Sequence, residues 1–357
     1  MKSARKQRIY YVALLLIAVA LATCSQQSSP FAPAAPTPVK PEIPVEPTPG
    51  APAEPAVRSY PGTKAIEVIV PWPAGGSTDR VSRVAASLLS ANLGATVTVM
   101  NEAGGQGVSG TVSALSSAAD GYTLLGDADG SNAIPEAWGT DVPYKAGERT
   151  YICRIASFPW FFAAAPGTGW KSMNDIAEAI RNTPSDIRFG WLGGTAGADC
   201  APAQFIAAMQ AHGIDTSAVH MVAFAGGTDL AAAIASGYVD FGCLSVASVA
   251  SVFETSTLQL ISITSRERFP AYPFVATTKE QGWGTVDFMG HVGFSGPDGM
   301  SEEAVQVLAD AMAEIMAGAE AEQKFREISA IPDYLGPQDF RAYVLSLADT
   351  LTAIKIN

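Results

Sequence analysis

Residues 66–79 read IEVIVPWPAGGSTD, and this stretch decides the fold. Residues 66–70 are apolar except for Glu67, which is typical of a buried strand, and a loop with two glycines then leads into a helical pattern over residues 78–91. The first turn of a helix has N–H groups without acceptors and a partial positive charge, and glycine lets a ligand approach the backbone closely. The stretch therefore predicts a strand, a loop and a helix whose backbone amides can hold an anion.

The same alternation continues along the chain. Further strands are expected at residues 95–100, 122–125, 151–165, 187–191, 219–224, 239–244 and 258–264. Further helices are expected up to residue 118, after the glycine loop at 193–197, and at 172–182, 230–236, 301–317 and 337–354. Strands that alternate with helices predict an α/β fold with a parallel sheet, and about 300 residues of this composition are enough for two lobes.

Three glycine-containing loops follow predicted strands. They lie at residues 71–79, 193–197 and 226–229. Open α/β sheets bind ligands at the carboxyl ends of their strands, so three such loops predict a pocket for an anion. A single loop of this kind can also be a purely steric turn, and the hydroxyls of Ser77, Thr78 and Thr195 can cap their own helices. For Asp79 we favour helix capping, because its charge would repel an anion.

The N-terminal residues have the pattern of an export signal. Four basic residues precede an apolar run from Ile9 to Ala22, which is shorter than the roughly 20 residues that a membrane-spanning helix needs. Cys24 ends a Leu-Ala-Thr-Cys sequence that resembles the bacterial lipobox, so we expect a signal peptide over residues 1–24 and a lipid on Cys24. Residues 25–61 are rich in proline and predict an extended linker; a disordered tail without an anchoring role is the alternative. The expected location is the periplasm or the cell surface.

Charge and cysteine content exclude other classes of protein. The chain has 34 acidic and 22 basic side chains and no basic cluster after the first eight residues, so we expect no binding to nucleic acid. If Cys24 carries a lipid, Cys153, Cys200 and Cys243 remain, and at most one intramolecular disulfide can form. Their spacing fits no zinc motif, and we expect neither a metal nor a cofactor.

Several sequence blocks also resemble those of a known family. Besides residues 66–79, the matching blocks are Asn101–Gly107, Asp120–Leu125 and Gly237–Asp240. From about residue 60 to the end, the chain resembles the substrate-binding proteins of tripartite tricarboxylate transporters, the Bug or TctC family. The resemblance implies a two-lobed periplasmic-binding-protein fold of type II, the Venus flytrap, in which each lobe is a mostly parallel sheet flanked by helices. We expect the first lobe at residues 62–164 plus 286–357 and the second at residues 165–285.

The resemblance also implies a function and a set of ligand contacts. The lobes would close on a small organic mono- or dicarboxylate, and the protein, acting as a monomer, would deliver it to membrane permease subunits. The residues implied for the first lobe are Ala74, Gly75, Gly76, Ser77 and Thr78. Those implied for the second lobe are Gly193, Gly194, Thr195 and Ala196, with a third turn at Gly226, Gly227 and Thr228.

Four positions in this implied pocket depart from the family pattern. They are Trp191, Asp199, Ala225 and Leu244, where a small residue, histidine, lysine and aspartate are common. The contacts to the far end of the ligand therefore stay open, and we keep Asp199 as a candidate contact. Trp72 and Trp191 could flank an aromatic ring or an apolar chain, although burial in the core explains either side chain equally well.

Two other functions remain open. A hydrolase could use Ser77 or Ser295, but residues 293–297 lack the last glycine of a nucleophile elbow, and neither His220 nor His291 lies in a recognisable triad context. The glycine loops also lack the patterns of P-loops and dinucleotide sites, so we expect no enzyme. A carboxylate sensor that signals to a kinase would share the fold and the ligand, and the sequence does not separate sensing from transport.

Overall fold

A computed structural model describes residues 60–139, 141–194, 196–253 and 258–354. The predicted signal peptide, Cys24 and Thr195 lie outside the described residues, as does the predicted linker up to residue 59. The linker was expected to extend to Pro61, but Tyr60 is buried and its hydroxyl donates a hydrogen bond of 2.5 Å to the carbonyl oxygen of Gly121. Tyr60 is therefore part of the fold. No helix among the described residues is long and apolar enough to cross a membrane.

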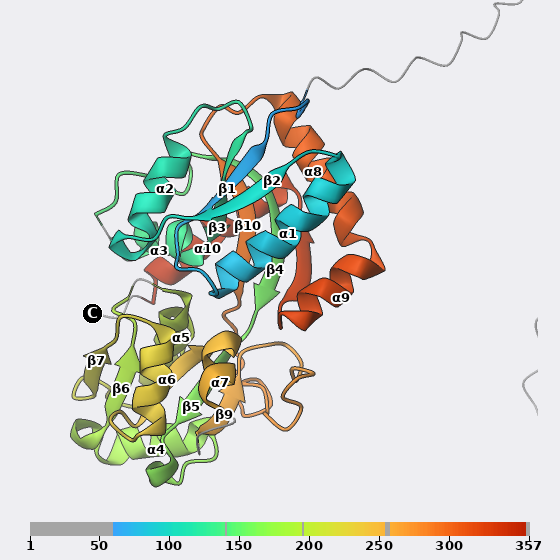
Figure 1. Ribbon diagram of the computed structural model, residues 1–357. Coiled ribbons are helices and arrows are strands. Elements are labelled where there is room, and N and C mark those ends of the chain that lie inside the picture. The colour runs from blue at the N-terminus through green and yellow to red at the C-terminus, as the bar shows by residue number, and fades with distance from the viewer. Residues whose placement is uncertain (1–59, 140, 195, 254–257, 355–357) are drawn as a thin grey trace, which may run out of the picture. The chain divides into compact units, whose positions relative to one another are not determined.

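The first lobe is built on a six-stranded sheet with the order β11-β4-β10-β3-β1-β2 (Figure 1). Its strands are β1 (Ile66–Val70), β2 (Val97–Asn101), β3 (Thr123–Ala128), β4 (Thr150–Phe158), β10 (Gly290–Gly296) and β11 (Ile331–Leu335). Its helices are α1 (Ser77–Leu93), α2 (Val108–Leu115), α3 (Ala133–Ala137), α8 (Glu302–Met316), α9 (Ala319–Glu327) and α10 (Pro337–Thr352). Ser301 caps α8 as predicted, because its hydroxyl accepts the N–H of Ala304 at 3.2 Å.

The second lobe is built on a five-stranded sheet with the order β7-β6-β8-β5-β9. Its strands are β5 (Trp160–Ala164), β6 (Arg188–Trp191), β7 (His220–Ala223), β8 (Phe241–Ser245) and β9 (Gln259–Ile263). Its helices are α4 (Met173–Asn182), α5 (Gly197–Ala211), α6 (Gly227–Ala235) and α7 (Val246–Phe253). Two-lobed α/β architecture with helices beside each sheet is thus confirmed (Figure 1).

Most strands of each sheet run in one direction, as expected, but both sheets are mixed. β1 is parallel to β2 and β3, and β6 is parallel to β7 and β8, but β10 and β5 are antiparallel to both of their neighbours. These two strands are the ones with which the chain enters a sheet from the other lobe. They start at the edge where the parallel strands end, so they run in the opposite direction.

The single strand expected at residues 151–165 is also wrong. It consists of β4 and β5, which belong to different sheets and are separated by Pro159. Proline has no N–H to donate to a ladder, which favours a break there. Residues 160–164 therefore lie in the second sheet, although the expected lobe boundary placed them in the first lobe.

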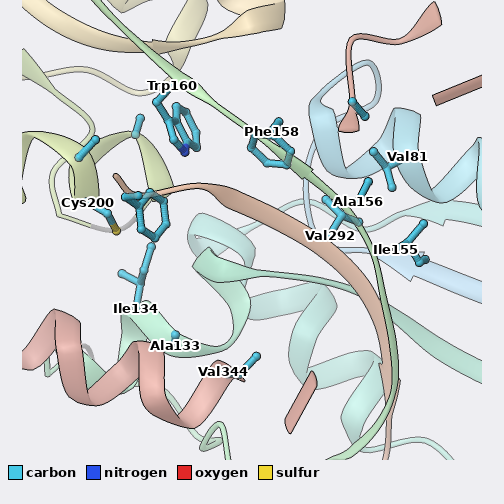
Figure 2. Packing of buried hydrophobic residues seen from close by; sticks show 14 of the residues in the cluster. Val81, Ala133, Ile134, Ile155, Ala156, Phe158, Trp160, Cys200, Val292 and Val344 are labelled. Atoms are coloured by element: carbon cyan, nitrogen blue, oxygen red, sulfur yellow. The ribbon is translucent and has the colours of Figure 1, made fainter. Parts of the chain in front are cut away.

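One apolar cluster contains side chains from both lobes. Ile134 of α3 and Val292 of β10 belong to it, together with Trp160 of β5 and Cys200 of α5. Figure 2 shows Phe158 and Trp160 where the chain leaves the first lobe, with Cys200 and Ile134 below them. The two lobes thus share apolar contacts beside the strands that connect them. Three cysteines, Cys153, Cys200 and Cys243, are buried and free.

Candidate ligand-binding site

The first glycine loop joins β1 to α1, and Asp79 fixes its shape. Asp79 is the third residue of α1 and is almost fully buried. Its Oδ2 accepts the N–H of Gly75 at 2.9 Å, and its Oδ1 accepts hydrogen bonds of 2.9 Å from Arg83 and from Asn101. Burial by itself would raise the pKa of Asp79, but the hydrogen bonds from Arg83, Gly75 and Asn101 hold this pKa below its usual value. Asp79 is therefore an ionised clamp of the loop.

The start of α1 leaves backbone donors unused. The N–H groups of Ser77, Thr78 and Asp79 have no acceptor among the described residues, and the first backbone bond of the helix runs from the N–H of Arg80 to the oxygen of Gly76. Ala74, Gly75 and Gly76 are exposed and form one surface with these donors. The structure thus brings the predicted first-lobe residues together in an arrangement suited to an anion.

The second glycine loop joins β6 to α5 and repeats the design. Asp199 is the third residue of α5, and its two oxygens accept the N–H groups of Leu192 at 2.7 Å and Gly194 at 2.9 Å. Gly193 and Gly194 have φ angles of +80° and +76°, which only glycine adopts readily. Asp199 is fully buried beneath the loop. The structure therefore places this candidate contact where Asp79 lies in the first lobe.

The third loop joins β7 to α6 and has a similar sequence, but its aspartate does not hold the loop. Asp229 is again the third residue of its helix, but it is exposed and makes no hydrogen bond to the described residues. Gly227 lies directly against the Ser248 side chain of α7, so a larger residue there would require this side chain to move. Because β6 and β7 are neighbours in the sheet, the second and third loops lie at the same edge. Leu244, by contrast, is buried in the apolar core of the second lobe.

The two candidate tryptophans have different partners. A Cβ on Gly107 would lie 2.8 Å from the ring of Trp72, so this ring packs on the loop between β2 and α2. Trp191 packs over Gly194, and Trp138 from the first lobe lies beside it. No ring contact among the described residues joins Trp72 to Trp191. The sequence interpretation missed Trp138, whose Nε1 donates to the oxygen of Leu351 at 3.0 Å.

The sequence interpretation also missed Asp129, which directly follows the carboxyl end of β3 in the first sheet. This side chain is 4% exposed, and its Oδ2 lies over Gly197, the first residue of α5 in the other lobe. The pKa of Asp129 is raised to about 7, chiefly by burial and in part by the charge of Asp127, although the N–H groups of Asp129 and His291 act to lower it. The sequence signal that could have indicated Asp129 was the pair Asp127 and Asp129 at the end of β3, a strand next to β1.

A buried polar network holds the segment that carries Asp129. The carboxylate of Asp127 accepts hydrogen bonds from Arg149 at 3.1 and 3.2 Å and from Ser131 at 2.8 Å. Ser295, a candidate nucleophile, donates its hydroxyl to the same carboxylate at 2.7 Å. Within the part of the chain that is described, no hydrogen bond links Ser295 to His291. Burial lowers the pKa of His291 to about 3, so this histidine is neutral at physiological pH.

A small cavity lies between the start of α1 in the first lobe and the second lobe. Its volume is about 10 Å³, close to what one water molecule needs. Ser77 and Arg80 of α1 line it from the first lobe, and Val246 and Ala247 of α7 line it from the second. The start of α1 therefore faces the start of α7 across the boundary between the lobes.

Comparison with known proteins identifies relatives and solved structures that are similar to this chain. Protein BugT of Bordetella pertussis is 27% identical over 294 residues, which cover 80% of this chain and 86% of BugT. MatC of Rhodopseudomonas palustris, solved with bound malate, has a TM-score of 0.70 at 19% identity and covers 83% of this chain and 99% of MatC. A second R. palustris protein, solved with adipate, has a TM-score of 0.71 at 21% identity, with 83% and 97% covered. The profile described as "Tripartite tricarboxylate transporter family receptor" matches residues 81–344, and the chain therefore belongs to this family.

Proposed function

We propose that this protein captures a small organic carboxylate outside the cytoplasm and delivers it to a tripartite tricarboxylate-type membrane permease. The observation that carries the proposal is the first turn of α1, whose N–H groups at Ser77, Thr78 and Asp79 have no acceptor among the described residues. Family membership supports a role in solute binding. The two R. palustris proteins of this fold, solved with malate and adipate, support a carboxylate as the ligand class.

The ligand carboxylate would lie on the exposed backbone of the glycine loops. The proposed contacts are Trp72, Ala74, Gly75, Gly76, Ser77 and Thr78 in the first lobe, and Trp191, Gly193, Gly194, Thr195, Ala196, Gly226, Gly227 and Thr228 in the second. Asp79 and Asp199 would act through the loops, because their oxygens already hold loop amides. Backbone amides and hydroxyls would thus bind the ligand's charge.

The remaining parts of the proposal concern location and assembly. Export through residues 1–24, a lipid on Cys24 and the proline-rich linker would hold a monomer at the outer face of the membrane, within reach of the permease. The expected absence of enzymatic activity also belongs to the proposal, and family membership supports it.

Thermal denaturation in the presence of single carboxylates tests the proposal. A ligand that binds only the folded state raises the melting temperature, by an amount that grows with ligand concentration. We expect such a rise with at least one mono- or dicarboxylate, and no rise with the matching amide or ester. Absence of any rise across the panel, together with turnover of an ester or amide, would show that the protein is an enzyme and not a solute-binding protein.

A further inference from the structure

Two buried polar atoms lie unpaired beside the start of α5. Neither Asp129 Oδ2 nor Trp160 Nε1 has a hydrogen-bond partner among the described residues. Asp129 is 4% exposed and Trp160 is 8% exposed, so solvent hardly reaches either group. Buried polar atoms in folded proteins are nearly always paired. An acceptor and a donor that are both unpaired at one place therefore call for a bound group.

Gly197 brings these two side chains together. A Cβ on Gly197 would overlap Asp129 Oδ2 and would lie 2.8 Å from Trp160 Cζ2, so both side chains lie against the first residue of α5. Asp129 reaches this point from the first lobe and Trp160 from the second. Gly197 is the last residue of the second glycine loop and the first of α5, so the unpaired atoms lie beside the proposed carboxylate cradle. Figure 2 shows Trp160 on the side of its strand that faces Cys200 of α5.

Asp129 has little freedom to turn toward another donor. It lies between Ala128 and Ser131, and the Ser131 hydroxyl accepts the N–H of Ala128 at 2.9 Å. The same hydroxyl donates to the buried carboxylate of Asp127, which the Arg149 guanidinium also holds. This network fixes the backbone on both sides of Asp129. The Asp129 carboxyl is therefore presented to the boundary between the lobes as a rigid acceptor.

The unpaired donor and acceptor restrict the chemistry of a single group that could pair with both. An ammonium group only donates hydrogen bonds and would leave the indole N–H of Trp160 unpaired. A carboxylate group only accepts them and would leave the oxygen of ionised Asp129 unpaired. A hydroxyl group donates one hydrogen bond and accepts others, so it can pair with both atoms at once.

We propose that Asp129 and Trp160 together bind a hydroxyl group of the ligand, so that the carboxylate captured here is a hydroxycarboxylate. The inference rests on the proposed function, because it adds a hydroxyl contact to a carboxylate held by the glycine loops. Asp129 and Trp160 are then specificity-determining residues, while the loops bind the carboxylate common to all ligands.

Calorimetric titration at pH 8, where Asp129 is ionised, tests the inference with matched ligands. The pairs are propionate with 2-hydroxypropionate, butyrate with 3-hydroxybutyrate, and succinate with 2-hydroxysuccinate; 2-aminosuccinate is the ammonium probe. We expect at least one hydroxy acid to bind on the order of 10- to 100-fold more tightly than its parent acid, as for a hydrogen bond to a charged group. The amino acid should bind no more tightly than succinate.

Two substitutions separate this contact from general effects on folding. Asp129→Ala removes the acceptor, and Trp160→Phe removes the donor while keeping an aromatic ring against Phe158. Each should bring the ratio of the two affinities close to one. Asp298→Ala, at an exposed position, should leave the ratio unchanged. Melting curves without ligand identify a variant that does not fold, in which case the other variant decides.

The outcomes distinguish this inference from the proposed function. If parent acids bind as tightly as hydroxy acids, if 2-aminosuccinate binds best, or if the preference survives both substitutions, the inference is wrong and carboxylate binding stands. If none of the carboxylates binds, the proposed function itself fails.

Discussion

At the scale of single residues, the proposed binding surface depends on the absence of a Cβ at Gly76. Gly76 has a φ of −70°, which any residue adopts, and a Cβ placed on it would meet only the oxygen of Pro73, at 3.6 Å. Nothing in the protein's own packing therefore requires glycine there. Under the proposed function, a methyl group there would stand between the ligand and the amides of α1.

Gly76→Ala should therefore reduce ligand affinity without reducing stability. We expect affinity for the best carboxylate to fall on the order of 10- to 100-fold, as for the loss of one hydrogen bond to a charged group. The free energy of unfolding should stay within about 0.5 kcal/mol of the wild-type value. Titration calorimetry and urea denaturation measure the two quantities. Gly167→Ala is the matched control, because its Cβ would meet no atom within 4 Å, and the ligand affinity of this variant should not change.

Asp129 predicts a pH dependence of stability. Its pKa rises from 3.8 in the reference state to about 7 in the folded protein, so the folded state keeps a proton that the unfolded state loses between these pH values. Stability contributed by this group is therefore lost as pH rises from about 4 to about 7. Asp129→Asn stays neutral, so its melting temperature relative to wild type should rise over this range and level off above it.

His291 acts in the opposite direction in the same pH range, because its pKa falls from 6.5 to about 3 and the unfolded state binds the extra proton. The histidine is present in both proteins, so the difference between their melting temperatures cancels its effect. A difference that does not change between pH 4 and pH 8 would show that Asp129 is ionised throughout.

At the scale of elements, α1 and α5 share one design for starting a helix after a strand. In each, an aspartate at the third helical position accepts an N–H from the preceding glycine loop, so the helix itself fixes the loop. The first-turn amides then stay available, because the aspartate binds the loop and not the helix end. At α6, Asp229 has the same position without these bonds, which makes it an internal comparison.

Asp199→Ala should destabilise the protein, whereas Asp229→Ala should not. The first substitution removes the acceptor of the partly buried N–H groups of Leu192 and Gly194, at a cost of about 0.5–1.5 kcal/mol for each hydrogen bond. The second removes an exposed side chain and should change the free energy of unfolding by less than about 0.5 kcal/mol. Urea denaturation of both variants measures the difference. Equal effects would mean that the position on the helix, and not the hydrogen bonds, determines stability.

At the scale of the whole molecule, Gly197 is a position at which the two lobes are in direct contact. A methyl group there would overlap the Asp129 carboxylate of the first lobe and would crowd Trp160 in the second. Gly197→Ala should therefore keep the lobes apart. We expect the ligand-induced decrease in radius of gyration, measured by small-angle X-ray scattering, to be lost, together with much of the affinity.

The double variant Gly197→Ala/Asp129→Ala is the control for this prediction. It removes the side chain of the first lobe with which the methyl group would collide, so part of the ligand-induced compaction should return. If Gly197→Ala alone compacts like the wild type, the contact between α5 and Asp129 does not limit closure.

The sequence predicted well wherever the local pattern and the tertiary role agree. The strand, loop and helix at residues 66–93 and the cap at Ser301 follow from hydrophobic patterning and capping chemistry alone. β10 could not be found in this way, because Gly290 and Gly293 are needed for the rings of Phe158 and Phe340, which come from distant segments. Asp129 was missed for the same reason, since the residues packed beside it belong to α5 and β5. Distant contacts, and not local propensity, determine these positions.

The route of the chain through the two sheets has a consequence for folding during the proposed export. β10 lies between β3 and β4 in the first sheet, yet it follows the whole second lobe in the sequence. The second lobe is continuous, so under this proposal it would fold as soon as it left the translocation channel. The first sheet stays divided until residue 296 has emerged, and until then the edges of β3 and β4 are open to pairing with other chains. The N-terminal lobe is thus the last to be completed, and a chaperone that protects the newly exported chain would have to cover these two edges.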